Sequence, residues 1–400
     1  MQHYHYIFTG SGLSALMTVY EMILSGKFDD KTILLLDEPE TKGRTGEANP
    51  KKSNDRTWCF WDNSSLFDEI VSKKWDIALF ADENFQRNLV LNTYQYKMIR
   101  GLDFYNLVFD LISKQNNIHF ANQKVIDFEE LGNHCIVKTD SEGSEQNYTC
   151  NKIFNSIYNP NLVKSQSKYP LLQQHFIGWF IKSKEEVFDK NKATFMDFSV
   201  EQRGNTRFMY VLPTSSTEAL LEYTLFSKDL LSKDEYENEI QKYIQNLGIT
   251  NYEIVEKEQG NIPMTSYKFW KHNTKNIIHI GSVGGWTKAS TGYTFKNTTK
   301  KSKALIQFLS KESDTSTSLS TNFRKFHKMD KFWFYDLLFL DVLFRRNDLG
   351  SKVFSALFKK GNPTLIFKFL DEETSFWEDL QVIWKCPKGL FIRALFGRIF

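Results

Sequence analysis

The chain has 400 residues, 41% of them apolar and 25% charged, which is the composition of a globular protein with room for two or three lobes. Its formal net charge of +3 is too small to indicate a nucleic-acid partner. The four cysteines match no metal-binding spacing and suit reduced thiols in the cytoplasm. The pattern predicts neither a signal peptide nor a bilayer-spanning helix. The 35 Phe favour either a large aromatic-lined cavity or simply an aromatic-rich core.

The first stretch predicts a βαβ unit that binds a nucleotide. An apolar strand at residues 5–9 runs into Gly-x-Gly-x-x-Ala at 10–15, a helical pattern follows over 16–25, and a second strand at 32–36 ends in Asp37. Glycines permit a tight turn and let backbone N–H groups approach a pyrophosphate at the start of a helix. We therefore expect the cofactor to contact the turn through Gly10, Gly12, Leu13 and Ser14, and its ribose to bond with Asp37.

A polar loop at residues 38–54 leads into an aromatic segment at 54–61 that contains Arg56, Trp58, Phe60 and Trp61. This segment is either an apolar anchor for the loop or an aromatic wall beside the cofactor. Arg56 either contacts the cofactor or pairs with a neighbouring acid. Further along, the spacing of apolar residues predicts an amphipathic helix over 103–114.

A second, β-rich lobe is predicted from about residue 169. Strand patterns occupy residues 174–181 and 193–198, and a hairpin joins 207–212 to 219–226. Alternation along the last strand puts Leu220, Glu222, Thr224 and Phe226 on one face. Glu222 thus lies mid-strand among apolar neighbours, where a carboxylate is costly unless it has a partner or a task.

A second glycine turn follows a buried strand at residues 276–280. It contains Gly281, Ser282, Gly284 and Gly285, and residues 290–295 then open a helix. A backbone nest of this kind suits an anionic cofactor. Two such strand–helix turns, far apart in sequence, are typical of flavoproteins that enclose FAD.

From residue 323 the pattern is helical to the end. The last segment, residues 390–400, is apolar with interspersed Arg. It either lies in a membrane interface or packs on the body of the protein.

Several of these segments together resemble the lycopene cyclase family of flavoproteins, specifically the bacterial lycopene β-cyclases. The resemblance spans most of residues 5–300, and it is carried most specifically by Asp55–Trp61 and by the run from Gly284 to Phe295. Further matching segments are 10–13, 195–198, 208–213, 221–224 and 262–264. The resemblance implies an α/β fold of the p-hydroxybenzoate-hydroxylase-like type, with an FAD-binding Rossmann-like domain, a β-sheet substrate lobe and a helical C-terminal region. We expect the FAD domain at 1–165 and 258–310, the substrate lobe at 166–257 and the helical region at 311–400.

The activity implied by the resemblance is non-redox cyclisation of lycopene, by way of γ-carotene, to β-carotene. FAD would be kept reduced by NAD(P)H. The family's essential Glu falls on Glu222, and it is followed here by Tyr223 where relatives often have a second acid. Asp197 is the second candidate acid, with a structural anchor as its alternative role. Residues 371–375 mimic the acidic motif of plant members but lack the strand before it, so we discount them.

The chemistry also suggests which side chains meet the substrate. Aromatic faces stabilise carbocations, and the candidates are Trp58, Phe60, Trp61 and Trp179. Because lycopene resides in the bilayer, we expect a peripheral protein on the cytoplasmic side of the membrane. The alternatives are a flavin-dependent monooxygenase or isoprenoid reductase acting on an apolar substrate, and a non-enzymatic isoprenoid carrier.

Overall fold

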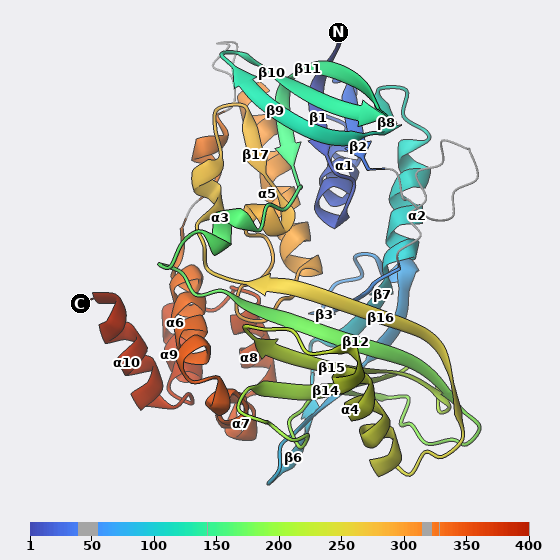
Figure 1. The fold of residues 1–400 in the computed structure, drawn as a ribbon, viewed down its shortest axis with the longest axis vertical. Coiled ribbons are helices and arrows are strands. Elements are labelled where there is room, and N and C mark those ends of the chain that lie inside the picture. The colour runs from blue at the N-terminus through green and yellow to red at the C-terminus, as the bar shows by residue number, and fades with distance from the viewer. Residues whose placement is uncertain (39–54, 142, 314–321, 328, 400) are drawn as a thin grey trace.

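A computed structural model describes residues 1–38, 55–141, 143–313, 322–327 and 329–399 of the chain. Two seven-stranded sheets lie one beyond the other, and the C-terminal helices stand along one side of them (Figure 1). The polar loop predicted before the aromatic segment lies almost wholly outside the described residues.

The first sheet contains the predicted βαβ unit. Its parallel part pairs β8, β2, β1, β11 and β17 in that order, and an antiparallel hairpin extends it from β11 through β10 to β9. Apolar side chains of β1 and β2 pack against α1 (Leu13–Ser25), which itself packs on α5 (Phe295–Ser313). The strands are β1 (Gln2–Thr9), β2 (Ile33–Asp37), β8 (Ile118–Asn122), β9 (Lys124–Leu131), β10 (His134–Ser141), β11 (Ser144–Asn155) and β17 (Ile277–His279).

The second sheet forms the β-rich lobe, in the order β16-β12-β15-β14-β13-β5-β6. One face is covered by α4 (Lys233–Asn246), which starts at a capping box formed by Ser232 and Glu235. The strands are β5 (Ile77–Ala81), β6 (Gln86–Val90), β12 (Leu172–Ser183), β13 (Lys192–Asp197), β14 (Thr206–Pro213), β15 (Glu218–Ser227) and β16 (Tyr252–Met264). The sheet thus recruits two strands from residues 77–90, outside the 166–257 range expected for this lobe, and β16 continues past that range.

A small third sheet joins the two lobes, with β7 (Gln95–Arg100) between β3 (Thr57–Asp62) and β4 (Val71–Trp75). The predicted amphipathic helix follows β7 directly as α2 (Gly101–Ile112) and buries Phe104 and Val108.

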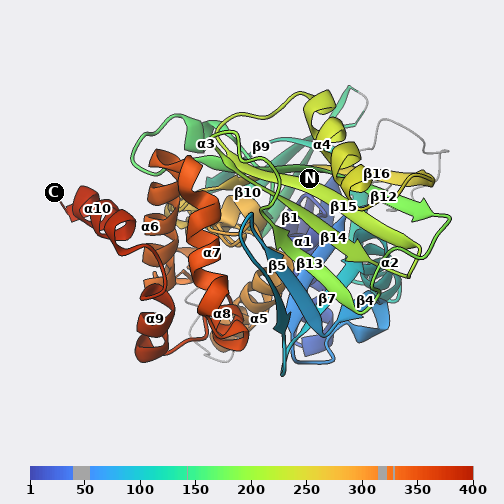
Figure 2. The same ribbon diagram turned by 90° about the horizontal axis from the view of Figure 1, so that it is seen from below.

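The chain is helical towards its C-terminus, as predicted, and these helices flank the second sheet (Figure 2). They are α6 (Lys331–Arg345), α7 (Gly350–Lys360), α8 (Pro363–Leu370), α9 (Phe376–Ile383) and α10 (Lys388–Ile399). Short helical turns elsewhere are η1 (Asp68–Ile70), α3 (Asn161–Lys164), η2 (Phe269–His272), η3 (Gly281–Gly284), η4 (Phe323–Lys325) and η5 (Asn347–Leu349). Among the described residues, none of the helices has the length and apolarity needed to cross a bilayer.

Candidate active site

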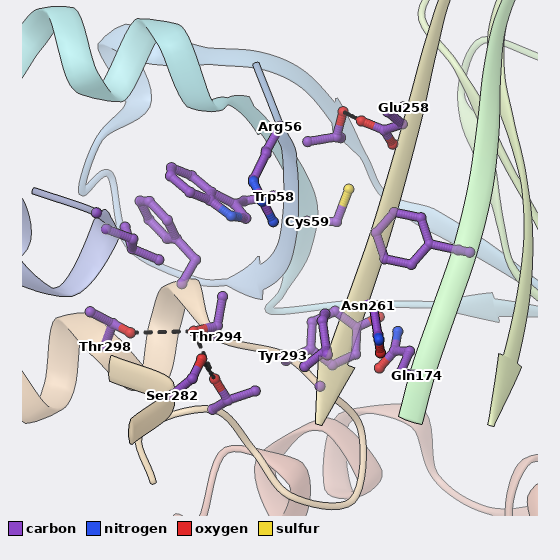
Figure 3. Close-up of a pocket in the computed structure, with 18 of the residues that line it drawn as sticks. Arg56, Trp58, Cys59, Gln174, Glu258, Asn261, Ser282, Tyr293, Thr294 and Thr298 are labelled. Carbon is purple, nitrogen blue, oxygen red and sulfur yellow. Dashed lines mark hydrogen bonds between the residues drawn. The ribbon is translucent and has the colours of Figure 1, made fainter. Parts of the chain in front are cut away.

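A cavity of about 810 Å³ lies where the two lobes meet. Its walls come from both glycine turns, from β3 and β7, and from the face of the second sheet that α4 leaves uncovered. Figure 3 shows polar and aromatic side chains around it from β3, from β12 and β16 of the second sheet, and from the second glycine turn and the segment after it.

The two glycine turns form one cradle, although they are about 270 residues apart. Gly12 precedes α1 and has no side chain to cap it, so first-turn N–H groups of that helix remain available where Gly12, Leu13 and Ser14 line the cavity. Gly281 is in the left-handed region with φ of +64°, and a Cβ there would lie 2.5 Å from the Ser14 hydroxyl oxygen. The close approach of these turns therefore requires glycine, and the uncapped helix end suits a pyrophosphate.

Buried polar atoms without partners extend this cradle towards the second lobe. Within the described chain, the Gln174 amide oxygen and the Thr291 hydroxyl are buried and find no hydrogen-bond partner, and both residues line the cavity. Nearby, hydrogen bonds link Ser282 through Thr287 to Thr294 over 3.2 and 3.4 Å (Figure 3). Unpaired buried polar groups are costly, so donors and acceptors at this position fit a polar ligand ring such as a flavin. The residues present thus fit FAD.

Glu222 lies on the cavity face of β15, as the alternation predicted, and is only 9% exposed. Its Oε1 accepts a hydrogen bond from the Thr224 hydroxyl at 2.6 Å. Burial and the negative charge of Glu258 raise the pKa of Glu222 well above its usual range, and outweigh the opposing effect of that hydrogen bond. The site therefore favours the neutral, protonated form of the Glu222 carboxyl.

Glu258 on β16 is a second carboxyl in the same cavity. The strand register aligns both glutamates with Gly178 of the intervening strand β12, so they point to the same side of the sheet across that glycine. The Thr57 hydroxyl donates to Glu258 Oε2 at 2.8 Å. Burial raises the pKa of Glu258, while Thr57 and the Arg100 charge act in the opposite direction.

Two buried tyrosines, the partly buried Tyr293 and Cys59 lie around the acids. The Tyr96 and Tyr293 hydroxyls are 3.1 Å apart, and Tyr210 is the cross-strand partner of Glu222 on β14. Burial raises the pKa of all three phenols, so they stay neutral and present aromatic faces to the cavity.

The aromatic segment divides between the two faces of β3. Trp58 and Arg56 line the cavity, as does Cys59, which we had not singled out (Figure 3). Phe60 lies outside the lining and stacks on Phe295 with ring centroids 4.8 Å apart. Trp61 packs against Tyr293 and Phe367 in the core of the second lobe. Alternation puts Trp58 and Phe60 on one face of β3 and Trp61 on the other, so the strand cannot present all three rings to one wall.

Two other candidates lie on the face of the second sheet covered by α4. Trp179 neighbours Gly178 and therefore points the opposite way, into the core under α4. Asp197 is buried and accepts a hydrogen bond from Tyr243 of α4 at 2.6 Å. Neither is among the residues that line the cavity. The location of Asp197 favours the structural role we considered for it.

The remaining cofactor candidates shape the turns. Gly10 has φ of +100°, and Asp37 accepts a hydrogen bond from Ser11 beside it. Gly284 and Gly285 form the second turn, where a Cβ on Gly284 would lie 2.2 Å from the His279 carbonyl oxygen. None of the four contributes to the cavity lining, and their roles toward FAD stay predictions.

The discounted acidic segment at 371–375 has partners of its own. Asp371 pairs with Lys296 at 2.5 Å, and Glu372 pairs with Lys288 at 2.9 Å. Lys288 also contacts Asp336 of α6 at 3.0 Å. These acids therefore tie the C-terminal helices to the segment that follows the second glycine turn.

With this geometry established, comparison with known proteins identifies the family. The family model described as lycopene cyclase protein matches residues 44–395. The chain belongs to this family. This match confirms the resemblance drawn from the motifs.

Two curated plant proteins match part of the chain. A chloroplastic neoxanthin synthase from Solanum tuberosum is 23% identical over 50% of this chain and 42% of its own length, and one from Solanum lycopersicum is 24% identical over 55% and 46%. The chain thus spans less than half the length of the curated relatives it matches.

The solved structures show the fold. A geranylgeranyl bacteriochlorophyll reductase-like protein from Thermoplasma acidophilum has a TM-score of 0.68 at 12% identity, with 98% of both chains covered. A p-nitrophenol 4-monooxygenase from Pseudomonas putida has a TM-score of 0.58 at 9% identity, again with 98% of both chains covered. The predicted p-hydroxybenzoate-hydroxylase-like flavoprotein fold is thus confirmed.

Sequence reasoning missed Glu258 and the three tyrosines. Alternation opposite Glu222 could have indicated Tyr210, and Tyr293 lies inside the specific run from Gly284 to Phe295. Glu258 occurs in a strand rich in charged residues, so only the pairing of β16 with β12 singles it out.

Proposed function

We propose that this lycopene cyclase converts the ψ-ends of lycopene to β-rings, by way of γ-carotene, while FAD is held reduced by NAD(P)H. The observation that carries the proposal is Glu222, a buried carboxyl with a raised pKa in a cavity bounded by aromatic residues and by the two glycine turns. An acid kept neutral by burial is what protonation of an alkene requires.

The reaction conserves atoms and electrons. Glu222 gives its proton to the terminal C=C bond, which leaves a tertiary carbocation. The neighbouring double bond attacks this cation, a ring C–C bond forms, and the positive charge moves to a ring carbon. Loss of one ring proton then creates the β-ring double bond, so substrate and product are isomers.

Stabilisation of the cation must supply most of the reduction in the activation barrier, because a carboxylic acid is a weak proton donor to an alkene. The faces of Tyr96, Tyr210 and Tyr293 surround the acid, and each cation–π contact contributes roughly 0.5–2 kcal/mol. Reduced FAD, when bound, would supply negative charge beside the reacting end. The aromatic wall also excludes water, which would otherwise hydrate the cation.

Expression in lycopene-accumulating cells tests the proposal. Wild type should yield β-carotene, and Glu222→Gln should leave lycopene unchanged while retaining bound FAD. Glu218→Gln, the same chemical change at the exposed start of β15, is the matched control and should behave as wild type. Oxygenated or hydrogenated products would instead support a monooxygenase or reductase. Unchanged lycopene with wild type would favour a carrier.

We further propose that the protein docks peripherally on the cytoplasmic side of the membrane, through α9 and α10. Four large apolar side chains on α9 and its C-terminal end are exposed, with Trp377 at 73% and Trp384 at 70%. On α10, Ala394 is buried against the body, whereas Ile392 and Phe396 are about half exposed. Lys388 lies 3.5 Å above the Trp384 ring, and tryptophan beside lysine suits the headgroup region of a bilayer.

Vesicle sedimentation of the full chain tests this surface. The double variant Trp377→Ala, Trp384→Ala should lose most of its binding to anionic vesicles and keep its folded circular dichroism spectrum. The control is Val255→Ala, which removes an exposed apolar side chain from β16 and should leave binding unchanged. Equal sedimentation of all three proteins would rule out α9 as the docking element.

A further inference from the structure

We propose that Glu222 and Glu258 act as a carboxyl pair that holds a single proton between them, with Glu258 as the positioning residue that keeps Glu222 protonated. The inference deepens the proposed cyclase reaction and rests on it. It supplies the second acid that is missing from the sequence, where Tyr223 follows Glu222.

The geometry of three adjacent strands creates the pair. Glu222 on β15 and Glu258 on β16 are both register partners of Gly178 on β12. A Cβ at position 178 would lie 3.4 Å from the Glu222 Cβ, 3.2 Å from the Glu258 Cγ and 2.8 Å from a Leu220 methyl carbon. The space that any other residue would fill is therefore occupied by the two glutamate side chains, and the proximity of Glu258 helps to raise the pKa of Glu222.

Each carboxyl has one further fixed donor. The Thr224 hydroxyl donates to Glu222, and the Thr57 hydroxyl donates to Glu258 from β3 on the other side of the cavity. A threonine hydroxyl supplies only one proton, so neither acid receives a full set of donors that would stabilise two negative charges. Two carboxylates side by side in a buried site share a proton more readily than both ionise.

The surrounding charges do not cancel this repulsion. The titratable or charged groups that face the pair are Cys59, Tyr96, Arg100, Tyr210, Glu256 and Tyr293. Arg56 and Lys257 line the same cavity. Of these cations Arg100 acts on Glu258 directly, but it already binds Glu256 at 2.7 and 2.8 Å and Asp55 at 2.7 Å. Asp55 and Glu256 therefore largely balance the positive charge of Arg100, which leaves little of it to stabilise a second negative charge on the pair.

The pair gives the cyclisation a donor and an acceptor in one unit. When Glu222 donates its proton to the alkene, both carboxyls become anionic, and their mutual repulsion makes them a strong base. The pair then accepts the proton lost from the ring carbon, which restores the starting state. Neither a redox partner nor a net proton is consumed by these steps.

The pH profile of cyclisation separates this role from a structural one. In Glu258→Gln, Glu222 loses its negative neighbour, so its proton dissociates at lower pH. The alkaline limb of the profile should move down by at least about one pH unit, with activity retained on the acidic side. Glu258→Asp should restore part of the shift, and Glu218→Gln should show none. A uniform loss of activity at all pH values, without displacement of the limb, would overturn the proposal.

Infrared titration tests the pair independently of turnover. Wild type minus Glu222→Gln difference spectra should contain a carboxylic acid band that persists above neutral pH, and this band should titrate at lower pH in Glu258→Gln. If the wild type binds FAD but makes no β-carotene, the proposed function is wrong. The infrared band would still decide whether the two carboxyls share a proton. A band that titrates at the same pH with and without Glu258 would refute the pair.

Gly178→Ala provides a second variant. The added methyl group would occupy the space between the two side chains and push the carboxyls apart. Because one of the atoms it meets is the flexible end of Leu220, we expect the protein to fold and to show the same downward shift of the alkaline limb as Glu258→Gln. A folded Gly178→Ala protein with the wild-type profile would contradict the geometry on which the pair depends.

Discussion

Replacing Lys288 by Met should destabilise the fold strongly, because this buried lysine bridges two acids, Asp336 and Glu372. Its ammonium lies 3.0 Å from Asp336 and 2.9 Å from Glu372, with the side chain 3% exposed. Burial alone would lower the pKa of Lys288, but the two carboxylates raise it above its usual range. Removing the lysine leaves two uncompensated acids, and breaking a buried ion pair from one side costs about 3–5 kcal/mol.

Glu372→Gln is the matched comparison. It leaves one lysine opposite one aspartate, so the charges balance, and we expect the free energy of unfolding to change by less than about 1 kcal/mol. Urea denaturation followed by circular dichroism measures both variants. Because the Lys288 carbonyl and N–H bond Gly292 and Tyr293 at the cavity wall, Lys288→Met should also weaken FAD retention. If Glu372→Gln were as damaging as Lys288→Met, the charge argument would be refuted.

Three further outcomes are expected. Gly281→Ala should weaken FAD binding about tenfold or more, measured by flavin titration, whereas Gly132→Ala, with the same φ of +64° on a remote hairpin, should not. Tyr243→Phe should lower the free energy of unfolding by about 1–3 kcal/mol and leave the product unchanged, since Asp197 loses only an anchor. Burial lowers the pKa of His175 to about 4, below its unfolded value of 6.5, so the contribution of His175 to stability is lost as pH falls. In urea denaturation, His175→Gln should therefore be less destabilising at pH 5 than at pH 7.

Local patterns were enough to predict much of the fold. The Gly-x-Gly turn, the strand ending at Asp37 and the alternation around Glu222 depend on neighbours in sequence, and the structure has each of them in place. The helical end was equally readable from its apolar spacing. Recruitment of β5 and β6 into the second sheet was not, because pairing of β5 with β13 joins segments more than 100 residues apart.

The candidate site was harder to predict because its residues meet only through long-range pairing. Glu222 is recognisable by itself as a buried acid, whereas Glu258 becomes its partner only through the register of β12 with both neighbours. Trp179 and Trp61 have the residue type expected of a cation-stabilising wall, but Trp179 lies on the strand face that α4 covers and Trp61 packs into the core of the second lobe. Residue type thus indicated the chemistry, and strand register decided which side chains reach the cavity.

The central claim is that the flavin is required but undergoes no net redox change. The most direct measurement incubates the purified protein anaerobically with lycopene in liposomes, FAD and a limiting amount of NAD(P)H. We expect many equivalents of β-carotene, identical in mass to lycopene, for each nicotinamide oxidised. A product that differs in mass by oxygen or hydrogen, formed one for one with nicotinamide oxidation, would contradict it.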